Sequence, residues 1–196
     1  MSQQSKNTLK SYFEVGKKPS QNNYIDLIDS KINLIEGGTL TGAITTASVT
    51  KGLVTLTATD AITAAEHAGR TLLMGEVGGN AECTFTLPAA TGTGNVYRFI
   101  VSVVNTSNYI IKVSDNTDTI DGTLIVVNDT GAGDAASVIY WPTVAATDTI
   151  TLNGTTKGGV VIGDYVELID IATNQFVIQG LLNASGTEVT PFSATV

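Results

Sequence analysis

The sequence predicts an all-β sandwich or barrel of about ten short antiparallel strands, preceded by a short helical arm. Runs of β-branched and aromatic residues recur at the short spacing typical of such folds, with turn residues between them. Only 14% of the residues are charged, and the chain is rich in Thr, Gly and Asn, which suits short strands and tight turns. Beyond Gly38 no segment has the apolar period of a helix, which argues against a parallel α/β sheet.

Residues 1–37 are predicted to form the helical arm. Leu9, Tyr12 and Phe13 share one face of a short helix, with Thr8 as its N-cap. Ser20 caps a second helix, whose apolar stripe consists of Tyr24, Leu27, Ile28, Ile32 and Ile35. The arm either packs on the β body of its own chain or docks on another subunit. Its position at a terminus, before a Gly-Gly hinge, favours docking.

The docking hypothesis assigns the interface to the large apolar side chains of the arm, because such side chains dominate protein interfaces. The expected docking or trimer-forming residues are Leu9, Tyr12, Phe13, Tyr24, Ile28 and Ile32.

Residues 38–52 are small and Thr-rich and are predicted to form a linker, and residues 53–196 are predicted to form the β body. The runs at 83–87, 96–104 and 109–113 follow one another closely and predict an antiparallel meander with one apolar face. Residues 181–196 are expected to form a last edge strand or an exchanged arm. The other expected strands are 53–58, 71–74, 124–128, 136–141, 149–152, 164–171 and 176–179.

The net charge of −8 is concentrated in the body, because residues 1–37 hold five lysines against four acidic residues. An acidic body argues against nucleic acid as a partner, since phosphate binding needs clustered Lys and Arg. The sequence shows neither a secretory signal nor an apolar run long enough to span a membrane, so we expect folding in the cytosol and no membrane partner. One cysteine excludes an internal disulfide.

No catalytic constellation, metal site or cofactor site is predicted, so we expect a protein that is not an enzyme. The single histidine, His67, is expected to be a surface or turn residue with local hydrogen bonds. Cys83 alternates with apolar neighbours and is expected to be a buried, inert thiol. Residues 115–122 are similar to a calcium loop but depart from its ligand spacing, which leaves a polar turn or a structural cation.

Two further motifs have a plain and a functional interpretation. Residues 129–134, DTGAGD, resemble a phosphate loop of ribokinase-like sugar kinases, but a strand pattern follows where that loop needs a helix. A Gly-rich hairpin loop is therefore predicted. Tyr140, Trp141 and Phe176 are expected to pack in the core or an interface, with a sugar-binding platform as the alternative.

The leader at 9–30, LKSYFEVGKKPSQNNYIDLIDS, resembles the N-terminal leader of virion structural proteins of tailed bacteriophages, including cyanophages. The turn TLPAA at 86–90, the apolar strand at 96–104 and DTITLNG at 148–154 are also similar to segments of those proteins. The resemblance implies a virion component that assembles in the host cytoplasm.

Two places on the virion agree with the resemblance. One is that of a capsid decoration (cement) protein, usually a homotrimer, which binds the major capsid protein of the assembled shell. The other is that of a tail or head fibre or collar component that binds a host receptor glycan. Fibres commonly carry repeats or heptads, and this sequence has neither, so decoration is the preferred hypothesis.

Overall fold

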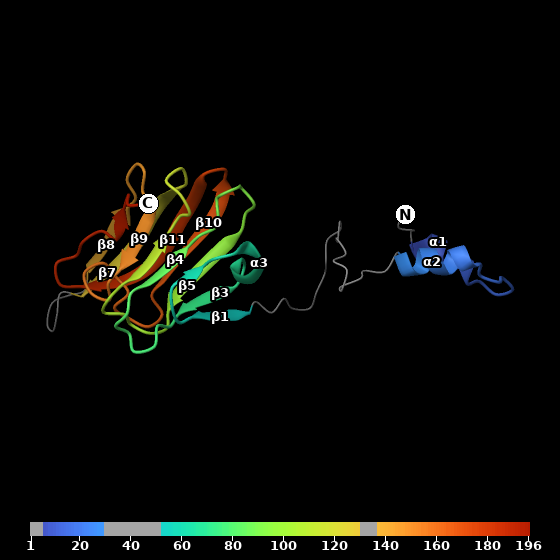
Figure 1. The fold of residues 1–196 in the computed structure, drawn as a ribbon, viewed down its shortest axis with the longest axis horizontal. Coiled ribbons are helices and arrows are strands. Elements are labelled where there is room, and N and C mark those ends of the chain that lie inside the picture. The colour runs from blue at the N-terminus through green and yellow to red at the C-terminus, as the bar shows by residue number, and fades with distance from the viewer. Residues whose placement is uncertain (1–5, 30–51, 130–136) are drawn as a thin grey trace. The chain divides into compact units, whose positions relative to one another are not determined.

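The computed structural model describes residues 6–29, 52–129 and 137–196. The chain divides into two compact units, Met1–Val49 and Thr50–Val196. The first unit contains helices α1 (Lys6–Tyr12) and α2 (Gln21–Asp29), and the second is a two-layer β sandwich with a short helix, α3 (Ala64–His67) (Figure 1).

Helices α1 and α2 are the two helices predicted for the arm. The amide of Asn23 donates to Ser20 Oγ (3.3 Å), and the amide of Ser20 donates to Asn23 Oδ1 (2.9 Å), which confirms Ser20 as the cap of α2. Thr8 lies inside α1, so its prediction as the N-cap is wrong. The turn after α1 passes through Gly16, whose φ of +86° favours glycine.

The sandwich consists of a seven-stranded and a five-stranded sheet. In spatial order the larger sheet contains β1 (Leu53–Leu56), β3 (Thr71–Met74), β5 (Val96–Val101), β10 (Tyr165–Ala172), β11 (Gln175–Ser185), β7 (Thr119–Asp129) and β8 (Ser137–Pro142). The smaller sheet contains β12 (Phe192–Ser193), β9 (Thr149–Leu152), β6 (Tyr109–Lys112), β4 (Cys83–Thr86) and β2 (Asp60–Ala61). The expected sandwich is thus observed, and within the described residues neither sheet closes into a barrel.

The prediction that the strands are antiparallel is wrong for half of the strand pairs. The pairs β1–β3, β3–β5, β7–β11, β2–β4 and β4–β6 are parallel, and the pairs β5–β10, β10–β11, β7–β8, β6–β9 and β9–β12 are antiparallel. The predicted meander of β4, β5 and β6 is also wrong. Strand β5 lies in the other sheet, and β4 pairs directly with β6.

Four of the five parallel pairs, β1–β3, β3–β5, β2–β4 and β4–β6, arise because the chain changes sheet after every strand from β1 to β7. The connections at 75–82, 87–95 and 102–108 are longer than a two-residue hairpin loop, so they can cross between sheets about 10 Å apart. Each pair of successive strands is therefore one turn of a two-sheet coil, and like strands of successive turns pair in parallel. The second half of the chain then adds strands to both sheets, and these pair antiparallel except that β11 lies parallel to β7.

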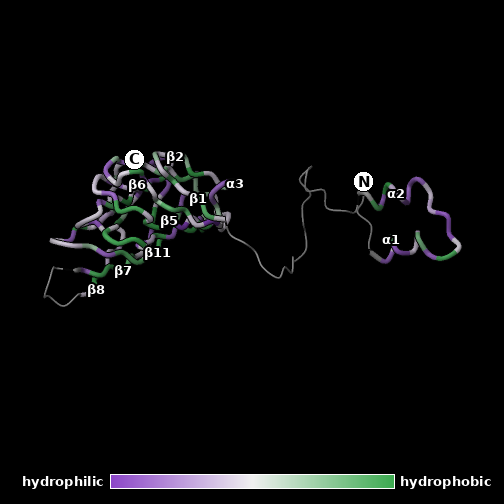
Figure 2. Tube along the Cα trace, turned by 90° about the horizontal axis from the view of Figure 1, so that it is seen from below, coloured by the Kyte–Doolittle hydropathy of each residue, from purple (hydrophilic) through white to green (hydrophobic). Residues whose placement is uncertain are grey.

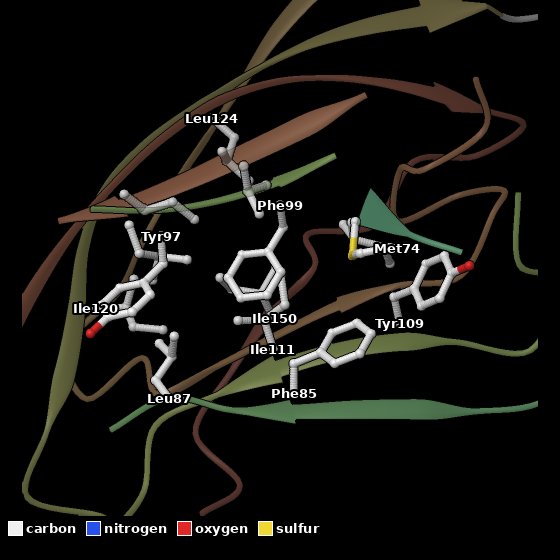
Figure 3. Close-up of a cluster of buried hydrophobic side chains, with 14 of the residues drawn as sticks. Met74, Phe85, Leu87, Tyr97, Phe99, Tyr109, Ile111, Ile120, Leu124 and Ile150 are labelled. Carbon is white, nitrogen blue, oxygen red and sulfur yellow. The ribbon is translucent and has the colours of Figure 1, made fainter. Parts of the chain in front are cut away.

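The core lies between the sheets, and β3, β4, β5, β6 and β10 contribute alternate residues to it (Figure 3). In β5 the side chains of Tyr97, Phe99 and Val101 are buried and their neighbours are partly exposed, as period-two burial requires. Phe99 stacks on Phe85 of the opposite sheet with ring centroids 5.8 Å apart. Phe85 in turn stacks on Tyr109 of β6 at 6.0 Å.

The expected strand segments agree with the observed strands to within a few residues, except that β7 and β11 are longer than expected. Residues 181–185 of the predicted tail belong to β11, and the remainder contains the short edge strand β12. Strand β2 and helix α3 were not predicted, because residues 60–69 show neither an apolar alternation nor an apolar stripe.

We predict that Gly180→Ala destabilises the sandwich by about 1–3 kcal/mol, because it overfills a packed site. Gly180 is buried in β11, and a Cβ there would collide with the backbone oxygen of Tyr165 and lie 2.9 Å from Leu124 Cδ2. Urea unfolding would measure the loss. Gly52→Ala is the matched control, since its Cβ would lie 3.9 Å from the nearest atom, Arg70 Cδ, and it should change stability by less than about 0.5 kcal/mol. Equal effects of the two substitutions would contradict the packing.

Candidate functional site

The helical hairpin presents an open apolar hollow of about 550 Å³, lined by Leu9, Lys10, Phe13 and Leu27. We call these four residues the hairpin surface. Leu9 and Lys10 lie in α1 and Phe13 directly follows it, and their i, i+1, i+4 spacing places all three toward one side of the helix. Leu27 belongs to the apolar stripe of α2. Hydrophobic and hydrophilic stretches alternate along this unit (Figure 2).

Two contacts hold the helices together beside this hollow. The Tyr12 hydroxyl donates to Asp26 Oδ2 (3.0 Å), and this hydrogen bond raises the pKa of Tyr12. The rings of Phe13 and Tyr24 pack edge to face with centroids 5.8 Å apart. Phe13 nevertheless stays 44% exposed and Tyr24 51% exposed, so the hairpin leaves much of its apolar surface uncovered.

The six residues predicted for docking have different outcomes. Leu9 and Phe13 line the hairpin surface, Tyr24 packs on Phe13, and Tyr12 is held by Asp26. The side chain of Ile28 and the whole of Ile32 lie outside the described residues.

Leu27 lines the hollow but was not among the six predicted residues. The apolar stripe of the second helix contained the signal for it, since Leu27 lies three positions after Tyr24.

A second apolar surface crosses the outer face of the seven-stranded sheet. The strand register places six side chains side by side, and we call them the outer row: Leu73, Ile100, Tyr165, Leu181, Ile125 and Tyr140. Exposure is greatest at the β8 end, where Tyr140 is 65% exposed and Ile125 44% exposed. Neighbouring Val138 is also exposed. Figure 2 shows hydrophobic stretches along β11 and β7 in this sheet.

The single histidine, His67, is buried and hydrogen-bonded within the fold. His67 is only 3% exposed, so the prediction of a surface residue is wrong, while the expected local hydrogen bonds are present. Its Nδ1 accepts from the backbone amide of Thr63 (3.0 Å), and the Thr63 hydroxyl caps α3 by accepting from the amide of Glu66 (3.3 Å). Nδ1 is therefore occupied as an acceptor and is not available to a substrate.

Cys83 and the three aromatic residues considered for a sugar-binding platform do not form one site. Cys83 is buried as predicted, and burial, followed by the charges of Glu76 and Glu82, raises the pKa of its thiol. Trp141 and Phe176 are buried in the core as predicted, whereas Tyr140 lies on the opposite face of β8, so the three do not form one platform.

The acidic stretch at 115–122 is only partly a loop, because Thr119 begins β7. Asp115 accepts from the amide of Thr117 (2.8 Å), Asp118 from the amide of Ala90 (3.1 Å) and Asp121 from Gln175 Nε2 (3.0 Å). Within residues 6–29, 52–129 and 137–196 no three His, Cys, Asp or Glu side chains are grouped so as to hold a metal ion. Residues 130–134 of the DTGAGD motif lie outside the described residues, and the strands that flank it, β7 and β8, pair antiparallel.

Buried carboxylates hold the loops of the sandwich. Asp170 of β10 is 3% exposed and accepts from three successive amides, those of Thr91 (3.0 Å), Gly92 (2.6 Å) and Thr93 (3.1 Å). Asp148 accepts from the amide of Thr195 (2.9 Å), which fixes the C-terminal segment. The buried acids are therefore satisfied by backbone donors within the loops.

The pKa values of two buried acids, Asp170 and Asp164, are shifted in opposite directions. Burial tends to raise the pKa of Asp170, but hydrogen bonds from the Thr93 hydroxyl and the loop amides outweigh it, so the pKa of Asp170 is lowered. Burial raises the pKa of Asp164, despite hydrogen bonds from Asn183 (2.6 Å from Nδ2) and the amide of Val161 (3.3 Å).

Comparison with models of protein families finds no family that matches the chain, and searches of curated proteins and of solved structures find no match. None of the helices in the described ranges is long and apolar enough to cross a membrane.

We predict that carboxyl titration followed by NMR gives a midpoint below the ordinary Asp value for Asp170 and above it for Asp164. Because the folded-state pKa of Asp170 is lowered, its contribution to stability is present above the unfolded value of about 4 and is lost as the pH falls through the folded value. The folded-state pKa of Asp164 is raised, so its ionised form lowers the stability of the fold. This loss of stability shrinks as the pH falls through the raised pKa and is gone below the unfolded value of about 4.

The same analysis predicts that Asp170→Asn lowers the free energy of unfolding at pH 7 by about 1.5–3 kcal/mol, the usual contribution of hydrogen bonds to a charged group. The loss should shrink as the pH falls below about 4. Asp60→Asn removes the same charge from an exposed position and is the matched control. A loss for Asp170→Asn that is the same at pH 7 and in acid would show that the carboxylate charge is irrelevant.

Proposed function

We propose that this protein is a structural component of a bacteriophage virion and acts as a capsid decoration protein, whose helical hairpin attaches the β body to the major capsid protein of the assembled shell. The observation that carries the proposal is the uncovered hairpin surface. A helix pair of this size buries little apolar area by itself, and Phe13 and Tyr24 remain about half exposed. The phage-type leader sequence covers these same helices and supports the proposal.

The proposed mechanism is stabilisation by binding. A protein that binds the assembled shell, and not its separated subunits, shifts the equilibrium toward the shell. Phe13 and Leu27 would supply the apolar contacts, and Lys10 would meet acidic groups on the shell surface. The β body takes no catalytic part in this proposal.

We also propose that the protein acts as a homo-oligomer, with a trimer as the expected state. The outer row supports self-association, because an apolar row at a sheet edge is seldom left in water. Strand β8 ends the sheet and carries no charged residue among Ser137–Pro142, so it lacks the charges that usually prevent edge contacts.

Capsid binding tests the attachment. Phe13→Ser and Leu27→Ser should each weaken binding to empty capsids at least about tenfold, because burying such a side chain contributes about 1.5–3 kcal/mol. Co-sedimentation with capsids would measure it. Val144→Ser removes an exposed apolar side chain of the body and should leave binding unchanged. Undiminished binding of both hairpin variants would rule out attachment through this surface.

The number of copies on the particle separates the two virion locations. A decoration protein should be present in many copies that follow the symmetry of the shell, whereas a fibre or collar protein should be present in few. Quantitative mass spectrometry of purified virions would measure this ratio. A low copy number would favour the fibre or collar location.

The oligomer is tested on the soluble protein. Ile125→Ser and Tyr140→Ser should shift the sedimentation coefficient from the oligomer to the monomer, because each removes an exposed apolar group from the outer row. Val77→Ser, at an exposed loop position, is the control that should leave the oligomer intact. A wild-type protein that sediments as a monomer at high concentration would contradict self-association.

A further inference from the structure

The chain contains two arginines, Arg70 and Arg98, and both lie at one small hollow on the outer face of the seven-stranded sheet. The hollow has a volume of about 110 Å³. Its other lining residues are Gly69, Thr71, Val96 and Glu167. The strand register brings these residues together, since Arg98 of β5 lies between Thr71 of β3, which follows Arg70, and Glu167 of β10.

The surroundings of Arg98 leave its positive charge without an anionic partner from the described part of the chain. Its guanidinium carbon lies 4.3 Å from the centre of the Tyr165 ring, so the ring supports one face of the planar group. Its Nε is buried and has no hydrogen-bond partner. Among the described residues the one ion pair is Lys17–Glu14 (3.0 Å), so no described carboxylate neutralises either arginine. A buried donor without an acceptor costs stability. Because Nε is closed to solvent, an anion from outside the chain would be met by the terminal nitrogens of the Arg98 guanidinium.

Glu167 lies directly opposite Arg98 in the sheet but is used elsewhere. Its Oε1 accepts from Gln179 Nε2 at 2.7 Å. The lining side chains thus comprise two cationic groups and one anionic group, in a chain whose net charge is −8. One singly charged anion neutralises this net positive charge, whereas the second negative charge of a dianion would remain uncompensated beside Glu167.

We infer that this hollow binds the carboxylate of a hydroxylated, singly charged ligand, which is either a sugar acid or a small hydroxy acid. The planar guanidinium of Arg98 matches a carboxylate in shape and can donate two parallel hydrogen bonds. Arg70 adds a second positive charge, and Glu167 offers an acceptor to a neighbouring hydroxyl. The volume accommodates the carboxylate and the adjacent carbon, so the rest of a larger ligand would extend into solvent.

The site is independent of the proposed attachment, because all of its residues belong to the β body. It lies at the β3 and β5 end of the outer face, whereas the most exposed part of the outer row lies at the β8 end. The two surfaces adjoin at Tyr165, which belongs to the outer row and whose ring supports Arg98.

Titration of the full-length protein with sodium glucuronate, sodium glycolate, glucose and inorganic phosphate tests the inference. Glucuronate should bind with a millimolar or tighter dissociation constant and shift the amide NMR signals of Gly69, Thr71 and Val96. Glucose should not bind, and phosphate should bind more weakly than glucuronate. Equal binding of glycolate and glucuronate supports a small hydroxy acid, and tighter glucuronate binding supports a sugar acid.

Arg98→Gln should weaken glucuronate binding at least about tenfold, through the loss of charged hydrogen bonds. Arg98→Lys keeps the charge but not the planar fork and should also weaken binding. Lys112→Gln removes one positive charge from the other sheet and should leave binding unchanged. Thermal unfolding of each variant would show that the sandwich is intact.

Three results would overturn the inference. They are the absence of glucuronate binding to the wild-type protein, tighter binding of phosphate than of glucuronate, and equal glucuronate binding by wild-type and folded Arg98→Gln protein.

Discussion

The contact between the two sheets at Phe85 and Phe99 is the interaction on which the sandwich depends. Phe85 stacks on both Phe99 and Tyr109, and all three are essentially buried. Aromatic pairs of this kind contribute about 0.5–1.5 kcal/mol beyond the area that they bury. Since β4, β5 and β6 follow one another in the chain but alternate between sheets, this stack joins successive crossings of the coil (Figure 3).

Buried polar groups hold the loops that cross between the two sheets. The Tyr109 hydroxyl donates to the backbone oxygen of Val103 (3.0 Å) and accepts from the amide of Glu76 (3.0 Å), so it links two of the crossing loops. At residues 91–93 another crossing loop is held by Asp170. In an acidic chain with few cations, backbone amides take the role that Lys and Arg have elsewhere, and the sandwich keeps its loops ordered without ion pairs among its described residues. The two arginines therefore remain available at the surface.

The described residues present three distinct surfaces, one on the helical unit and two on the sandwich, and each has a different physical character. The hairpin surface is apolar and belongs to a unit with little core, the outer row is apolar at an uncharged sheet edge, and the arginine hollow is cationic on an acidic body. These characters support the proposed adhesion to a shell, the proposed self-association and the inferred recognition of a carboxylate, in that order. The single histidine of the chain serves within the fold, because its Nδ1 accepts a hydrogen bond from the backbone amide of Thr63.

The positions of most strands, the helices α1 and α2 and the buried sides of β4 and β6 were determined by the sequence, because local alternation and capping are properties of neighbouring residues. Pairing was decided only by the tertiary structure. An alternating strand such as β4 has the same pattern whether its partner is parallel or antiparallel, and the choice depends on whether the next loop turns back or crosses to the other layer. The arginine hollow likewise required the fold, since Arg70 and Arg98 are distant in sequence and meet only because β3 and β5 are parallel neighbours.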